Sequence, residues 1–199
     1  MKRSISAGLL AVAAASVPSL AFAHTGAGAT HGFEHGFAHP LTGPDHLLAM
    51  VAVGLLAAQL GGRALWAVPA SFLSLMLVGG AIGMTGLDLP YVEIAIALSV
   101  VVLGGAVALG APLPAAAAMT LAGAFALFHG QAHGAEMPND VSGMSYAAGF
   151  LFATAILHLA GIALGMGIGQ LGKARGTLMR GAGAAIALAG AVILVQAVA

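Results

Sequence analysis

Apolar residues form long runs along most of the chain, and short stretches with glycine, proline or charge separate these runs. Six runs reach the roughly 20 residues that a helix needs to cross a bilayer. They cover residues 43–60, 65–84, 91–109, 115–134, 145–169 and 178–198. Only a helix or a closed barrel satisfies its backbone in lipid, and these runs are too continuously apolar for barrel strands. The pattern therefore predicts an all-α, polytopic membrane bundle of six transmembrane helices in one domain, residues 39–199.

An additional apolar run near the start, within residues 1–23, differs from the other six. It has a basic beginning, a short apolar middle and an Ala-Phe-Ala sequence that ends at Ala23. This order is typical of a secretory signal peptide, and the apolar middle is shorter than a spanning helix. We expect cleavage after Ala23, which places His24 on the outer face of a bacterial inner membrane. An uncleaved first helix is the alternative.

The basic residues between the runs indicate an orientation. Arg63 lies between the first and second runs, and Lys173, Arg175 and Arg180 lie between the fifth and sixth. With the N-terminus outside, both connections are cytoplasmic, as the positive-inside rule requires. We therefore expect a multi-pass inner-membrane protein whose mature N-terminus and C-terminus are both periplasmic.

Composition supports a membrane protein and limits its chemistry. Hydrophobic residues make up 60% of the chain and charged residues 6%, with a mean hydropathy of +1.04, so the lipid bilayer is an expected partner. A net charge of zero indicates no nucleic-acid partner. Cysteine is absent, which excludes disulfides and thiolate metal sites. The eight histidines need an explanation, because polar side chains are costly in lipid.

Residues 24–38 are rich in glycine and histidine, and we expect a periplasmic segment too short to fold alone. His24 at a new N-terminus would offer an amino group and an imidazole to a metal ion. A flexible leader without any role is the alternative.

The stretch before the first spanning run contains three potential metal ligands. Its two prolines, glycine and threonine predict an irregular turn and a helix that begins close to Pro44. His39 would then lie just outside the helix, with Asp45 and His46 in its first turn. The alternative is structural, because Thr42 and Asp45 have the spacing of a capping box.

The fourth run carries a second group of potential ligands. His129 and His133 are one helical turn apart and share a face, and Glu136 follows three residues later. The first helix runs inward and the fourth runs outward, so both groups should lie at the outer end of the bundle. Such spacing favours a metal site.

Three further residues extend this hypothesis. Met50 lies one turn after His46 and offers a thioether, although ordinary packing is the alternative. Glu93 lies near the outer start of the third helix, where it could simply stabilise the helix dipole. His158 lies near the middle of the fifth helix, where the alternative is a core histidine bonded to a carbonyl.

The two motifs, His-x5-Asp-His and Phe-His-Gly-x-Ala-His-Gly-x-Glu, resemble the signatures of the HupE/UreJ nickel or cobalt permeases, which are hydrogenase and urease accessory membrane proteins. The likeness extends to the Gly-Phe-x-His-Gly-Phe-x-His-Pro run, the signal peptide and the number of helices, so it spans nearly the whole chain. It implies uptake of Ni²⁺ across the inner membrane. The functional positions that it implies are His39, Asp45, His46, His129, His133 and Glu136. Met50, Glu93, His158 and His24 rest on chemistry alone.

Imidazole and carboxylate groups suit Ni²⁺ and Co²⁺, and intrinsic affinity favours Ni²⁺ without excluding Co²⁺. We predict a secondary transporter, not an enzyme, with the metal ion as transported substrate and no prosthetic group. A homo-oligomer is compatible with the sequence. The main alternative is an intramembrane metal-dependent hydrolase, for which no serine or extra acid is suitably placed. A haem protein and a metal sensor are the others.

Overall fold

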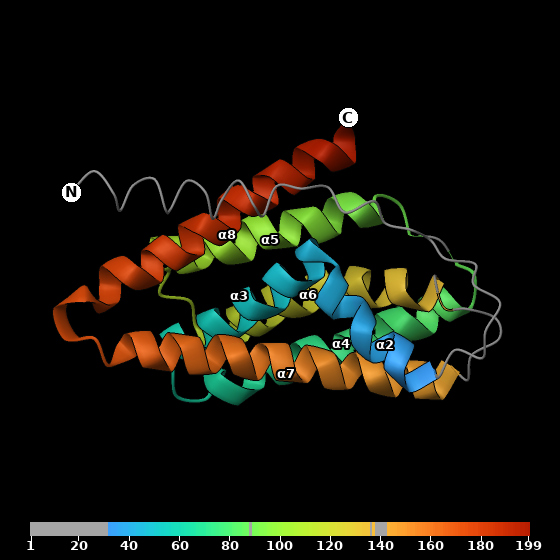
Figure 1. The fold of residues 1–199 in the computed structure, drawn as a ribbon, viewed down its shortest axis with the longest axis horizontal. Helices are drawn as coiled ribbons and strands as arrows, with labels where there is room; N and C mark the ends of the chain where they lie inside the picture. The colour runs from blue at the N-terminus through green and yellow to red at the C-terminus, as the bar shows by residue number, and fades with distance from the viewer. Residues whose placement is uncertain (1–31, 88, 136, 138–142) are drawn as a thin grey trace.

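The computed structural model describes residues 32–87, 89–135, 137 and 143–199. These residues form seven α-helices, one 3-10 helix and no strand, which confirms the all-α prediction (Figure 1). The elements are α2 (Gly32–Thr42), α3 (Pro44–Leu60), α4 (Ala64–Met84), α5 (Val92–Leu109), α6 (Ala115–Ala135), α7 (Gly143–Gly169), η1 (Gly172–Ala174) and α8 (Arg175–Val198). The predicted signal peptide, His24 and Glu136 lie outside the described residues.

Each of the six apolar runs forms one helix, with ends within a few residues of those predicted. Four helices are long and apolar enough to cross a membrane: α4, α5, α7 and α8 with η1. The pair α2 and α3, bent by 80°, would make a fifth span. The count of six spans is therefore not confirmed. Of the other two runs, α3 alone has only 17 residues, and α6 carries two histidines and a glutamine that lower its apolar character.

The beginning of the described chain differs from the sequence prediction. The helix α3 starts at Pro44 as expected, but the preceding residues form α2, and His39 lies in its last turn. The expected irregular turn before Pro44 is therefore wrong up to Thr42, where the chain is helical. Close packing on α7 explains this, because a Cβ atom at Gly36 would overlap the carbonyl oxygen of Tyr146.

The helices are arranged mainly as closely packed pairs. The most extensive contacts join α4 with α6, α5 with α8, and α3 with α7, and α2 also packs on α7. Figure 1 shows α5 and α8 side by side and α2 crossing one end of α7. The central helix is α3, which contacts every other α-helix and buries most of its length. Any site at an end of α3 is thus surrounded by several helices.

Glycines let the α4–α6 pair approach at the level of the backbone. A Cβ atom at Gly130 would overlap the carbonyl oxygen of Met76, and one at Gly134 would overlap that of Gly80. On α6 these two glycines directly follow the two histidines. Because neighbouring residues on a helix point about 100° apart, the glycine face packs on α4 and the histidines point elsewhere.

Glycine occurs at every fourth position of α7 over Gly161, Gly165 and Gly169, and it serves packing at two of these three positions. A Cβ atom at Gly161 would overlap the carbonyl oxygen of Val51, and one at Gly165 would lie 2.6 Å from the Cβ atom of Ala58. No atom lies within 4 Å of such a Cβ at Gly169. The first two glycines thus hold α7 against α3.

Candidate metal site

Four histidine rings from three helices meet at one end of the bundle. They are His39 on α2, His46 on α3, and His129 and His133 on α6. The ring centroid of His46 lies 4.5 Å from that of His133 and 4.7 Å from that of His129. The centroid of His39 lies 4.7 Å from that of His133. The structure therefore brings the two sequence motifs together, and we call these four residues the histidine cluster.

The cluster is buried and its hydrogen bonding is incomplete. His129 is 0% exposed, His133 is 1% exposed and His46 is 8% exposed. His46 Nε2, His129 Nδ1 and both ring nitrogens of His133 have no hydrogen-bond partner among the described residues. Buried polar atoms are costly unless they are paired. The unpaired nitrogens are therefore candidates for binding a ligand.

Asp45 determines which nitrogen of His46 is available. Its Oδ1 atom accepts the backbone N–H of His46 at 2.7 Å and lies 2.8 Å from His46 Nδ1. An ionised carboxylate only accepts, so Nδ1 carries the proton and Nε2 keeps its lone pair. Carboxylates orient metal-binding histidines in this way. A reciprocal capping box is not formed, because the N-cap residue is Gly43 and the Thr42 hydroxyl donates to the carbonyl oxygen of His39. Asp45 still accepts one first-turn N–H, so it also stabilises the start of the helix.

Ser99 on α5 has the corresponding effect on His129. The Ser99 hydroxyl donates to the carbonyl oxygen of Ile96 at 2.6 Å, and its Oγ atom lies 2.9 Å from His129 Nε2. A hydroxyl has one hydrogen, so His129 Nε2–H is the donor to Ser99, and Nδ1 keeps its lone pair. The sequence interpretation did not include Ser99. A polar residue in a spanning run was the signal that could have identified it.

The cluster as drawn is not a completed coordination shell. No group of three or more histidine, aspartate or glutamate side chains, within the ranges that the structure describes, could hold a metal ion. All four of the ring pairs within the cluster meet edge to face. Ligation by the cluster therefore requires rotation of its side chains.

Deeper in the bundle, two predicted residues lie on the inward side of the cluster. Met50 is fully buried one turn beyond His46 on α3. His158 on α7 is 1% exposed, and neither of its ring nitrogens has a partner in the described chain. The ring of Phe72 separates His158 from the cluster, since its centroid lies 5.2 Å from that of His158 and 5.6 Å from that of His129.

One face of α7 connects the cluster to His158. The ring centroid of Phe150 lies 4.0 Å from that of His133. Thr154 follows one turn later, and His158 another turn later. The Thr154 side chain is 0% exposed and its hydroxyl has no partner among the described residues. Neither Thr154 nor Phe72 was identified from the sequence, because a single threonine or phenylalanine in an apolar helix is usually a packing residue.

Glu93 is the described candidate that lies neither in the cluster nor in the buried interior next to it. It lies in the first turn of α5 and is exposed, whereas three of the four rings are buried. None of the hydrogen bonds, ion pairs or ring contacts found in the described ranges joins Glu93 to the histidines.

Comparisons with known proteins agree with the resemblance drawn from the motifs. A family model described as HupE / UreJ protein matches residues 11–193. Protein HupE of Rhizobium leguminosarum bv. viciae is 48% identical over 184 residues, which cover 92% of this chain and 95% of that protein. No solved structure gives a significant match.

Proposed function

Because the chain belongs to the HupE / UreJ family, we propose that it is a secondary transporter that takes up Ni²⁺ or Co²⁺ across the bacterial inner membrane. The family comprises accessory proteins of nickel and cobalt transport and is not a family of enzymes. Several long apolar helices identify a multi-pass membrane protein. In this proposal the histidine cluster faces the periplasm, as do the mature N-terminus and the C-terminus.

The observation that carries this proposal is the gathering of imidazoles whose free nitrogens are already selected. Asp45 leaves His46 Nε2 available, and Ser99 leaves His129 Nδ1 available. Imidazole nitrogen is a suitable ligand for Ni²⁺ and Co²⁺. His39 and His133 would complete the set after side-chain rotation. Glu136 and His24 stay predictions, since they lie outside the described residues.

We propose that the ion moves from the cluster past Phe72 to His158, with Met50 and the Thr154 hydroxyl lining the route. Binding at each step must be weak enough for release. The membrane potential supplies a driving force of about 4.6 kcal/mol per 100 mV for an inward divalent cation, twice the value for one charge. Nucleotide hydrolysis is therefore not required.

Uptake of radioactive nickel and cobalt by cells that express the full chain tests this function. We expect His46→Ala and His133→Ala to reduce uptake at low metal concentration at least tenfold, because each removes a buried ligand. His35→Ala is the matched control, since His35 is an exposed histidine on α2 outside the cluster. Native uptake by both cluster variants would contradict the proposed site.

A second measurement separates transport from metal sensing. Purified protein is inserted into sealed vesicles that contain a metal-sensitive dye, and Ni²⁺ is added outside the vesicles. A transporter produces a dye signal that depends on the direction of the membrane potential. Binding of Ni²⁺ to the protein without any signal from the dye would favour a sensor.

A further inference from the structure

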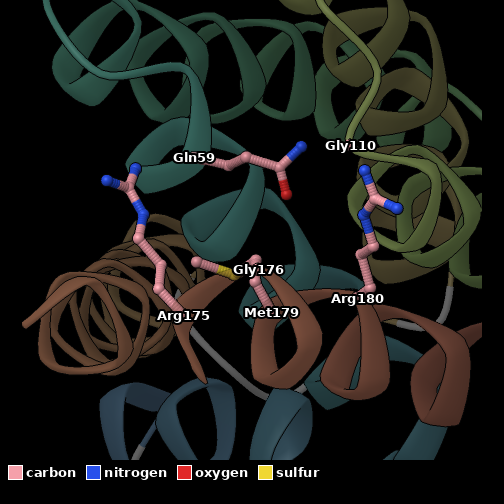
Figure 2. A pocket seen from close by; sticks show the side chains of 6 residues that line it. All are labelled: Gln59, Gly110, Arg175, Gly176, Met179 and Arg180. Atoms are coloured by element: carbon pink, nitrogen blue, oxygen red, sulfur yellow. The ribbon is translucent and has the colours of Figure 1, made fainter. Parts of the chain in front are cut away.

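A second polar site lies at the other end of α3, away from the histidines. A cavity of about 180 Å³ opens there between α3, the end of α5 and the start of α8. It is lined by Gln59, Gly110, Arg175, Gly176, Met179 and Arg180 (Figure 2). A helix rises 1.5 Å per residue, so Gln59 lies about 20 Å along α3 from His46. The cavity is therefore separate from the metal site.

The side-chain amide of Gln59 in this cavity lacks hydrogen-bond partners in the described chain. Figure 2 shows Arg175 and Arg180 on either side of Gln59, whose side-chain amide extends into the space between them. Both polar atoms of that amide are buried, and neither has a hydrogen-bond partner in the described chain. A buried amide without partners is costly, which indicates that a ligand with hydrogen-bonding groups completes the site.

The position of Arg180 leaves most of its donors available. A Cβ atom at Gly110 would lie 3.6 Å from Arg180 Nη2, so the guanidinium group lies beside the C-terminal end of α5. The carbonyl groups at a helix C-terminus attract a cation there. A guanidinium group carries five N–H donors, which this position leaves beside the cavity.

Positive charge at this end of the molecule is not compensated by the chain itself. No acidic residue occurs in positions 46–87, 94–135 or 141–199, which include all three connections beside the cavity. These same positions contain all four basic residues of the transmembrane region: Arg63, Lys173, Arg175 and Arg180. The only ion pair among the described residues is that of Asp45 with His46, at the far end of α3. No acidic side chain from these positions therefore balances the two exposed arginines that line the cavity.

We propose that this cavity binds a phosphate group, either that of an anionic phospholipid headgroup or a free phosphate ion. Arginine pairs bind phosphate oxygens with short, charge-assisted hydrogen bonds. The volume is smaller than the 300–1,000 Å³ typical of sites for larger organic ligands, and it suits a headgroup-sized anion. Basic pockets between transmembrane helices on the cytoplasmic side bind lipid headgroups in this way. The proposal does not depend on metal transport.

Binding to the purified, delipidated full chain tests the proposal. Native mass spectrometry measures binding of phosphatidylglycerol and of neutral phosphatidylcholine, and calorimetry measures binding of inorganic phosphate. We expect the Arg175→Gln, Arg180→Gln double variant to bind the phosphate group about thirtyfold more weakly, from about fivefold for each arginine near an anionic surface. Arg63→Gln and Lys173→Gln are matched controls, because they remove the same charge without lining the cavity. We expect both controls to bind within about twofold of the native protein.

A further variant keeps the proposal testable if the double variant does not fold. Gln59→Leu keeps both charges and removes only the amide, and we expect binding about threefold to tenfold weaker. Preference for phosphatidylglycerol supports a lipid ligand, and binding of inorganic phosphate without lipid preference supports a free anion. Equal binding of neutral and anionic lipid together with no binding of phosphate overturns the proposal. Equal losses in the cavity variants and the two controls also overturn it.

Discussion

A hydrogen bond to one ring nitrogen of His46, and another to one ring nitrogen of His129, determine which nitrogen of each ring is left to bind a cation. Asp45 holds Nδ1 of His46, and Ser99 holds Nε2 of His129, so the two rings present opposite nitrogens. Such partners of a ligand typically change metal affinity by 10- to 100-fold when removed. Neither partner needs to touch the ion to matter.

Ser99→Ala removes the hydroxyl that accepts the His129 proton. We expect the Ni²⁺ dissociation constant of the purified protein to rise about tenfold, because His129 can then adopt the other tautomer and orientation. Calorimetry measures this constant. Thr120→Ala is the control, since that exposed α6 hydroxyl bonds only to Ala116 of its own helix. Native affinity in Ser99→Ala would show that the contact does not position His129.

Asp45→Asn keeps the shape of the side chain and removes its charge. We expect Ni²⁺ affinity to fall 10- to 100-fold, because the amide orients His46 less firmly than the carboxylate does. The unfolding temperature should change little, because the side-chain oxygen of asparagine can still accept the backbone N–H of His46. Glu34→Gln removes an exposed acid on α2 and should leave both quantities unchanged. A large loss of stability in Asp45→Asn without loss of affinity would instead indicate a structural role.

At the residue scale, the sequence was sufficient to predict that the histidines come together. It was not sufficient to predict all the residues that surround them. The spacing of His129 and His133 places them on one face, and helix direction places that face beside His46. Ser99 and Phe72 could not be predicted, because their roles depend on which faces of α5 and α4 turn toward α6. That rotation follows from side-chain packing, which spacing alone does not specify.

At the scale of the helices, close backbone contact between α4 and α6 sets the direction in which the α6 histidines point. The glycines at Gly130 and Gly134 occupy the face of α6 that lies on α4. The adjacent histidine face is thereby turned toward α3. The position of the glycines thus matters for the site although no glycine binds a ligand.

Gly130→Ala tests this directional role. The added methyl group would overlap the carbonyl oxygen of Met76, so the two helices must separate. We expect destabilisation of about 1–3 kcal/mol, as for other overpacked interiors, together with weaker Ni²⁺ binding. Thermal unfolding followed by size-exclusion chromatography measures the first effect. Gly105→Ala is the control, because no atom lies within 4 Å of a Cβ there. If Gly130→Ala lowers stability no more than Gly105→Ala does, this role is contradicted.

The positions of the spanning helices followed from apolar runs, because a run in lipid has few other ways to satisfy its backbone. The helix α2 did not follow, because its glycines and Pro40 are unfavourable within an isolated helix. Packing against α7 stabilises α2 despite its low intrinsic preference for a helix. Contacts between distant segments are what sequence patterns describe least well.

At the scale of the whole molecule, the direction of insertion can be tested with single cysteines, because the native chain has none. We expect Ala174→Cys to react with a membrane-impermeant thiol reagent only after the membrane is opened. Leu87→Cys should react in intact spheroplasts, because its connection lies at the opposite end of α4 from Arg63. Both residues are exposed. The reverse pattern of labelling would show that the molecule is inserted with the opposite orientation.

The helix pairs have a consequence for how an ion leaves the site. The cluster and its positioning residues come from helices that belong to different pairs: α3 packs with α7, α6 with α4, and α5 with α8. A relative shift of two pairs therefore changes the distances between ligand nitrogens directly. In the proposed transport cycle, opening a way inward and separating the ligands would be the same movement. The ion would then be released by the motion that lets it pass, with no separate step to extract it from an intact set of ligands.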